Sequence, residues 1–170
     1  MNARRLLAAF VLVATMLATF SSEQSYARSG VTDKVDRRVE KVLERTGWKY
    51  EIDSDGDFRL HFRFSDGRTQ VVFVRSKTVD IDGLEVREIW SPGIRATGSL
   101  DERTAIDLLR ENSRIKIGAW RLANSREGCI AIFAVQIGAE IDRETLMTVA
   151  RAAGVVADNK EKAATERDDL

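Results

Sequence analysis

The sequence predicts an α+β domain, an antiparallel sheet with helices packed on it in the order α-β-β-β-(β)-α-β-β-α. Three Asp-Gly pairs, at residues 55–56, 66–67 and 82–83, separate segments in which apolar and polar residues alternate. Such pairs between alternating segments are the strongest short-range signal for β-hairpins. Segments with a helical apolar period lie before, between and after these strands, so strands and helices occur in separate runs.

The first predicted element is a helix that opens at Thr32-Asp33 and ends at Gly47. Its apolar stripe consists of Val35, Val39, Val42 and Leu43. From Trp48 the apolar period changes from helical to two. We expect four strands, at residues 48–52, 58–64, 71–75 and 84–90. The meander is expected to stop at Ser91-Pro92-Gly93, which contains the only proline of the chain.

A second helix is predicted after Ser99, because Ser99 and Glu102 have the spacing of a capping box. This helix ends near Asn112 and has three apolar residues on one face, namely Ala105, Leu108 and Leu109. Two further strands are expected at residues 115–122 and 129–137. A bulge at Gly118 would let Trp120 pack in the core.

Asp142 is expected to cap the last helix. Its inward residues are Leu146, Val149, Ala150, Ala153 and Ala157. Residues 159–170 are mostly charged and are predicted to fray. The chain after its leader is therefore predicted to form a single domain at residues 28–158.

Residues 1–27 have the pattern of a secretory signal peptide. Arg4 and Arg5 precede an apolar-to-neutral run at residues 6–20, and a polar segment then ends at a small-x-small site at Ala27. The run is shorter than the roughly 20 residues that span a bilayer. We expect cleavage near Ala27, a periplasmic or extracellular location, and no membrane span afterwards. An uncleaved anchor is the alternative.

Composition narrows the classes of partner and of chemistry. Lysines plus arginines equal aspartates plus glutamates at 27 each, and the two signs are interleaved, so no basic stripe indicates nucleic-acid binding. Cys129 is the only cysteine and lies in an apolar run, which predicts a buried side chain and excludes an intrachain disulfide. A reactive thiol or an intermolecular disulfide is the alternative for Cys129.

No catalytic or cofactor-binding constellation stands out in the sequence. His61 is the only histidine and falls on the polar side of its strand, so it is expected to be solvated. One histidine and one in-strand cysteine do not supply the usual ligands of a zinc site. Phosphate-binding glycine motifs are absent. We therefore expect a protein that is not an enzyme and that needs no cofactor or metal.

The acidic segment at residues 53–57 raises the alternative of a calcium site. An EF-hand loop that began at Asp53 would have its glycine at the sixth position and its glutamate at the twelfth, but Phe58 and Phe64 stand there. A hairpin turn explains the same residues, because Asp and Gly suit tight turns. A small-ligand or metal-ion sensor that uses the Asp-rich turns is thus the second hypothesis for function.

Three apolar residues indicate association with a protein partner. Ile89 and Trp90 are adjacent, so a strand points them to opposite faces, and Ile94 extends the apolar surface beyond Pro92. Aromatic anchors of this kind are enriched at interfaces. The alternative is that a helix covers the second face, or that a bulge restores the alternation. Ile89, Trp90 and Ile94 are the predicted partner-binding residues.

The order of elements and several local signatures resemble the YbjN family, whose fold is like that of type III secretion chaperones. The matching segments are the opening helix leading into Thr46-Gly47-Trp48-Lys49-Tyr50, the acidic turn at residues 53–57, Leu108-Leu109-Arg110-Glu111-Asn112, Ile117-Gly118-Ala119-Trp120-Arg121-Leu122, and Val156-Ala157-Asp158 with Glu161. The resemblance implies a domain, often dimeric, that binds protein segments in the manner of a chaperone or adaptor. We therefore expect a non-catalytic, exported protein-binding module whose partner the sequence does not name.

Overall fold

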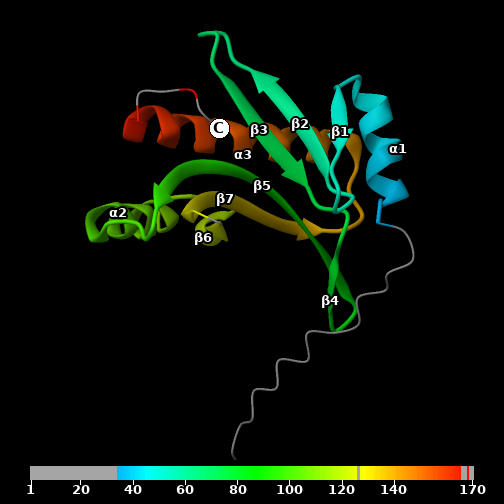
Figure 1. The fold of residues 1–170 in the computed structure, drawn as a ribbon. Helices are drawn as coiled ribbons and strands as arrows, with labels where there is room; N and C mark the ends of the chain where they lie inside the picture. The colour runs from blue at the N-terminus through cyan, green and yellow to red at the C-terminus, as the bar shows by residue number, and fades with distance from the viewer. Residues whose placement is uncertain (1–33, 126, 166–167, 169–170) are drawn as a thin grey trace, which may run out of the picture.

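The computed structural model describes residues 34–125, 127–165 and 168 (Figure 1). The predicted signal peptide and the predicted cap at Thr32-Asp33 lie outside the described residues. The elements are α1 (Arg37–Thr46), β1 (Tyr50–Ile52), β2 (Phe58–Arg63), β3 (Thr69–Val74), β4 (Val79–Ile81), β5 (Leu84–Thr97), α2 (Glu102–Asn112), β6 (Ala119–Ser125), β7 (Gly128–Gly138) and α3 (Arg143–Thr165).

The strands form one antiparallel sheet in the order β1-β2-β3-β5-β7-β6, with β4 paired to the start of β5. The predicted α+β class, with an antiparallel sheet and three helices, is confirmed. Five strands rather than four precede α2. The additional strand is β4, which the sequence analysis missed because three residues are too short to show an alternating pattern.

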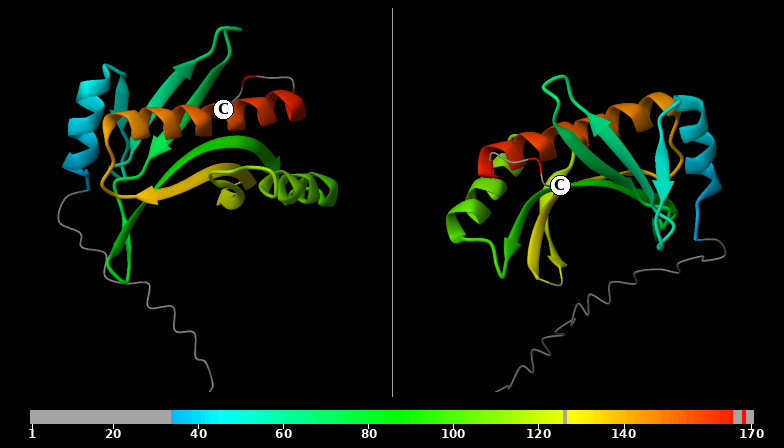
Figure 2. Two further views of the ribbon diagram at one scale, coloured as in Figure 1. Left: turned by 180° about the vertical axis from the view of Figure 1, so that it is seen from behind. Right: turned by 45° about the horizontal axis from the view of Figure 1, so that its top comes forward.

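All three helices pack on one face of this sheet. In Figure 1 α3 runs behind the strands, and in the left panel of Figure 2 it runs in front of them. Leu43 of α1, Leu108 of α2 and Ala150 of α3 belong to one buried cluster. The strands add their inward side chains to that cluster, including Leu60, Val72, Ile89, Phe133 and Val135. A single core therefore lies between the sheet and the helices.

Helix α1 is held to the sheet by a buried arginine of β5. Asp36 caps the helix by accepting a hydrogen bond from the Arg38 backbone N–H, and the helix ends at Gly47 as predicted. Arg87 has no exposed surface, and its Nη2 donates to Asp36 Oδ2 over 2.5 Å. Its other donors reach the backbone carbonyls of Arg75, Ser76 and Ala139. Each nitrogen of this buried guanidinium thus donates at least one hydrogen bond within the chain.

Strand β5 does not stop at Pro92 but continues to Thr97, which corrects the predicted end of the meander. Pro92 pairs with Ile132 of β7, and the register shifts between Pro92 and Ile94. A β-bulge absorbs the proline and bends the strand. Gly93 is needed there because a Cβ atom would lie 2.6 Å from the Trp120 ring. The predicted packing of Trp120 in the core is confirmed, and the bulge lies at Gly93 in the neighbouring part of the sheet.

Strand β4 and residues 84–86 of β5 form a hairpin that we call the arm. Asp82 and Gly83 make its turn with φ angles of 51° and 89°, the left-handed pair that a type I′ turn requires. The arm extends away from the helices at the lower end of the molecule in Figure 1. The predicted Asp-Gly turn at residues 82–83 is confirmed.

The boundaries of the last elements differ from the prediction in three places. Asp101, not Ser99, caps α2, because its carboxylate accepts the Thr104 backbone N–H. Leu109 of α2 points to solvent and is 68% exposed, so it is not part of the inward face. Strand β6 begins at Ala119, so residues 115–118 are a connection rather than a strand.

Helix α3 does not fray at residue 159 but continues to Thr165. Its polar residues Asp158 and Glu161 are buried because Arg68, which precedes β3, reaches both. The Arg68 Nε–Asp158 Oδ1 distance is 2.6 Å, and the Arg68 Nη2–Glu161 Oε2 distance is 3.0 Å. These ion pairs fix the end of α3 on the sheet. None of the helices in the described residues is long and apolar enough to cross a membrane.

Candidate functional site: the open face of the sheet

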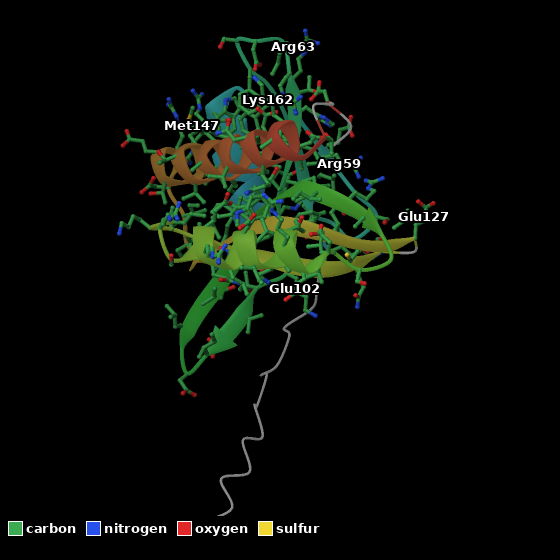
Figure 3. All side chains as sticks on the ribbon, turned by 90° about the vertical axis from the view of Figure 1, so that its left-hand side faces the viewer. Arg59, Arg63, Glu102, Glu127, Met147 and Lys162 are labelled. Atoms are coloured by element: carbon green, nitrogen blue, oxygen red, sulfur yellow. The ribbon has the colours of Figure 1, made fainter. Side chains whose placement is uncertain are left out.

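The sheet face opposite the helices is the candidate site, and we call it the open face. Strand pairing aligns one row of its residues across six strands. The row consists of Glu51, Arg59, Phe73, Trp90, Ala134 and Ala119. None of the described helices packs on this side. Arg59 of β2 and Met147 of α3 are labelled in Figure 3.

Two stacked aromatic rings form the centre of the open face. The Phe73 and Trp90 rings lie 4.1 Å apart between centroids, at an interplanar angle of 10°. The Arg59 guanidinium carbon lies 5.3 Å from the Phe73 centroid, within the range of a cation–π interaction. Phe73 and Trp90 are only half-buried. The rings therefore present an apolar surface that is fixed in orientation and still reachable from solvent.

A shallow hollow of about 330 Å³ lies next to this stack. Its lining residues are Arg59, His61, Thr69, Gln70, Val71 and Phe73. Gln70 is buried, and its side-chain amide donates a hydrogen bond to the Pro92 carbonyl. This bond links β3 to β5 beside the hollow. The hollow extends the surface of the aromatic pair towards β2 with polar as well as apolar side chains.

The arm continues the open face beyond the body of the sheet. In its two strands Val79 pairs with Val86, and Ile81 pairs with Leu84, so these four apolar side chains share one side of the hairpin. Ile81 is 55% exposed and Leu84 is 60% exposed. Because Val86 and Trp90 have the same parity along β5, this side of the arm is continuous with the open face. Apolar side chains so exposed are typical of interaction surfaces.

Of the three predicted partner-binding residues, only Trp90 lies on the open face. Ile89 has no exposed surface and Ile94 is 8% exposed, and both belong to the core. The bulge between Pro92 and Ile94 turns Ile94 inward, which is the alternative that the sequence left open. The two isoleucines therefore cannot contribute exposed contact area in this structure. Phe73 and the arm, which do contribute it, were not predicted.

His61 and Cys129 occupy the positions that the sequence predicts for them. His61 stands on the open face with 59% of its side chain exposed, and its Nε2 is 3.8 Å from Glu51 Oε2. Cys129 is buried. The two residues are on separate strands, β2 and β7, with β3 and β5 between them. The structure therefore does not bring them together as a nucleophile and its base.

The Asp-rich turn at residues 53–57 uses its carboxylates to hold the chain. Asp53 Oδ1 accepts the backbone N–H groups of Asp55 and Asp57, and Asp57 Oδ1 accepts that of Ser76. Burial raises the pKa of the Asp57 carboxyl, against the lowering effect of the Ser76 hydrogen bond. These contacts are those of a hairpin turn.

A second acidic group gathers at the end of α3. Carboxylate oxygens of Asp158, Glu161 and Asp168 lie within 4.8 Å of one another. Arg68 contacts all three, at 2.6, 3.0 and 3.9 Å. The positive charge at the centre of this cluster is thus supplied by Arg68. The cluster belongs to the ion pairs that hold the end of α3 on the sheet.

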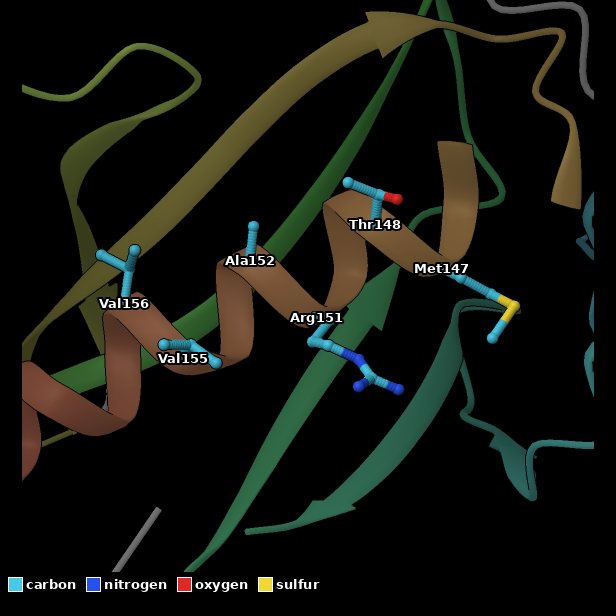
Figure 4. Close-up of a pocket in the computed structure, with 6 residues that line it drawn as sticks. All are labelled: Met147, Thr148, Arg151, Ala152, Val155 and Val156. Carbon is cyan, nitrogen blue, oxygen red and sulfur yellow. The ribbon is translucent and has the colours of Figure 1, made fainter. Parts of the chain in front are cut away.

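The solvent-facing side of α3 offers a contrasting surface. A shallow apolar depression there is lined by Met147, Thr148, Arg151, Ala152, Val155 and Val156 (Figure 4). All six residues come from one helix, whereas the open face combines side chains from β1 to β7. The open face is therefore built from more elements than the α3 surface.

Comparison with known proteins adds no family assignment. No family model matches the chain, and no curated protein matches its sequence.

Proposed function

We propose that this chain is a non-catalytic, exported protein-binding module of the chaperone or adaptor type, and that it binds its partner on the open face. The observation that carries the proposal is the uncovered Phe73–Trp90 stack. Aromatic rings fixed in place lose little conformational entropy on binding, which makes them effective anchors. The exposed apolar side of the arm supports the same proposal, because it extends the contact area without a break.

The proposed fold family rests on the residues that resemble the YbjN family. An α+β domain with helices on one side of an antiparallel sheet is compatible with a type III secretion chaperone-like fold. Export rests on the pattern of residues 1–27. Trp90 keeps its proposed role, and Phe73 with the arm replaces Ile89 and Ile94 in the contact surface.

A photo-crosslinking experiment tests the use of the open face. A photoreactive amino acid is placed at Val71, in the hollow, and in a matched control at Val155, on the solvent-facing side of α3. Both variants are expressed with their own leader, and adducts in the exported fraction are identified by mass spectrometry. We expect one discrete heterologous adduct from position 71 and none from position 155.

Trp90→Ala is the second variant in this test. The substitution removes one ring of the stack, so it should abolish the adduct at position 71 while circular dichroism shows a folded protein. An adduct that forms only from position 155 would contradict the proposal. A covalent dimer of this chain from position 71 would show instead that the open face is used for self-association.

A further inference from the structure

The open face carries more positively charged than negatively charged side chains, and the positively charged ones are arginines. Strand pairing places four arginines on this face, namely Arg59, Arg63, Arg95 and Arg121. Arg75, directly after β3, reaches the same face through its contact with Glu88. By the same pairing the face carries two carboxylates, Glu51 and Glu88. The strands therefore present an excess of positive charge on the open face, although the chain as a whole has no net charge.

The two carboxylates do not neutralise this excess. Glu88 is bound by Arg121 and lies 4.0 Å from Arg75, and Arg75 Nε also lies 3.3 Å from Asp57 Oδ2, so these two arginines are paired within the chain. Glu51 approaches Arg59 and His61 only to 3.8 Å. Arg63 and Arg95 have no carboxylate within 4.0 Å among the described residues. The surplus is thus concentrated on Arg59 and Arg63 along β2 and on Arg95 beyond the bulge.

The identity of the cations favours a protein ligand. Arginine and aromatic residues are enriched at protein interfaces, whereas lysine is depleted. The planar guanidinium can also bind a carboxylate through two parallel hydrogen bonds. Arg59 and Arg63 are four residues apart on one strand, which places them about 13 Å apart on the same face. Carboxylates at alternate positions of an extended segment can reach both.

The aromatic stack disfavours a nucleic acid as the ligand. Single-stranded nucleic acids bind sheet faces by stacking bases on aromatic rings. Trp90 covers one face of the Phe73 ring and the Arg59 guanidinium lies over this ring as well, so Phe73 is already engaged by contacts within the chain. A second copy of this chain, bound face to face, would oppose two surfaces of like charge, which is unfavourable.

We propose that the segment bound by the open face is an acidic, extended polypeptide, an inference that rests on the proposed function. Its carboxylates pair with Arg59 and Arg63, and its apolar side chains lie against the Phe73–Trp90 stack.

Defined peptides test this proposal without knowledge of the natural partner. A rhodamine-labelled peptide of alternating Glu and Leu is titrated with residues 28–170, and binding is followed by fluorescence anisotropy. We expect saturable binding that weakens about fivefold or more between about 0.05 and 0.5 M salt, because these charges are exposed and screened. A peptide of alternating Lys and Leu and a thymidine oligonucleotide should not bind.

A matched pair of variants locates the interaction. The double variant Arg59→Gln/Arg63→Gln should weaken binding of the Glu–Leu peptide about tenfold, in line with the loss of close charge pairs. The double variant Lys41→Gln/Arg45→Gln removes the same charge from exposed positions of α1 and should leave binding unchanged.

Three results would overturn the proposal: no binding of the Glu–Leu peptide, equal weakening by both double variants, or comparable binding of the Lys–Leu peptide or the oligonucleotide. If the adduct at position 71 persists in any of these cases, only the acidic character of the partner is wrong. If that adduct is also absent, the proposed function fails.

Discussion

Ile89 and Trp90 are neighbours in β5, yet they lie in opposite environments. Ile89 is enclosed by the helices and has no exposed surface, whereas Trp90 is half-buried and stacks on Phe73. Each face of the sheet thus has an apolar centre, but only one of the two centres is covered by described elements. The difference shows that apolar patterning alone does not separate a core from a contact surface, because both contain large side chains.

The arginines of the two faces differ in the same way. Arg87 is fully buried, and each of its three side-chain nitrogens donates to an acceptor within the chain. Arg95, eight positions further along β5 but beyond the bulge, is exposed on the open face. A buried guanidinium must be satisfied internally, whereas an exposed one is available to another molecule. The arginine of the inner side is therefore satisfied within the fold, whereas Arg95 on the open face is accessible to solvent.

The largest expected effect in this comparison comes from the buried arginine. Arg87→Met leaves three backbone carbonyls and part of Asp36 without their donor, so it should lower the free energy of unfolding by about 3–5 kcal/mol. Arg95→Met, the control on the open face, should change it by less than about 0.5 kcal/mol. Urea denaturation of both variants, followed by circular dichroism, measures the difference. Equal losses would show that the two arginines have the same structural role.

A smaller effect is expected from the two neighbours in β5. Ile89→Ala should cost about 2–5 kcal/mol of stability, because it leaves a cavity in the core. Trp90→Ala should cost only about 1–2 kcal/mol, because half of a ring and one stacking contact are lost. Trp90→Ala should nevertheless abolish partner binding, whereas Ile89→Ala should retain it at temperatures where the variant is folded. Unfolding of the Trp90 variant would place this residue in the structural core.

The smallest effect concerns the polar side of the arm. Arg38 binds Glu85 through two hydrogen bonds of 2.7 Å, and these bonds, with one from Thr78, lower the pKa of Glu85 from 4.5 to about 2. A carboxyl group whose pKa is lower in the folded state stabilises the fold above its unfolded pKa, and this contribution is lost as the pH falls from about 4.5 to about 2.

Glu85→Gln should therefore reduce the pH dependence of the unfolding free energy in this window. The change should be below about 1 kcal/mol, because Arg38 and Glu85 are both partly exposed and their attraction is screened. Glu51→Gln on the open face is the control, since its nearest cations are 3.8 Å away and its effect should be smaller still. Urea titrations at several pH values measure both. An unchanged slope in Glu85→Gln would contradict the assignment.

The sequence predicts well what depends on local signals. The alternation of Phe58, Leu60 and Phe62 with polar residues identifies β2, and the Asp-Gly pairs identify three hairpin turns. Local signals give a wrong prediction where contacts between distant parts of the chain override them. Pro92 reads as a stop, but a bulge carries β5 past it, and this bulge also reverses the expected side of Ile94. Residues 159–165 read as a frayed tail because their partner, Arg68, is distant in sequence.

The candidate site could be predicted only at Trp90. Phe73 lies in an apolar run with Val72 and Val74, so no alternation marks its side of the strand. The arginine excess is also invisible in sequence, because charges of both signs are interleaved along the chain. Only the strand order β2-β3-β5-β7-β6 brings Arg59, Arg75 and Arg121 to one surface. Which strands become neighbours is decided by the global packing, not by any local pattern.

The anchoring of α3 has a consequence for the timing of folding. Arg68 binds Glu161, 93 positions later, and Arg38 binds Glu140, 102 positions later. Contacts between such distant positions form slowly, because a long loop must close first. Until α3 has been synthesised, the inner faces of β3, β5 and β7 remain in contact with water. The core between the sheet and the helices is therefore completed only after α3 has been synthesised.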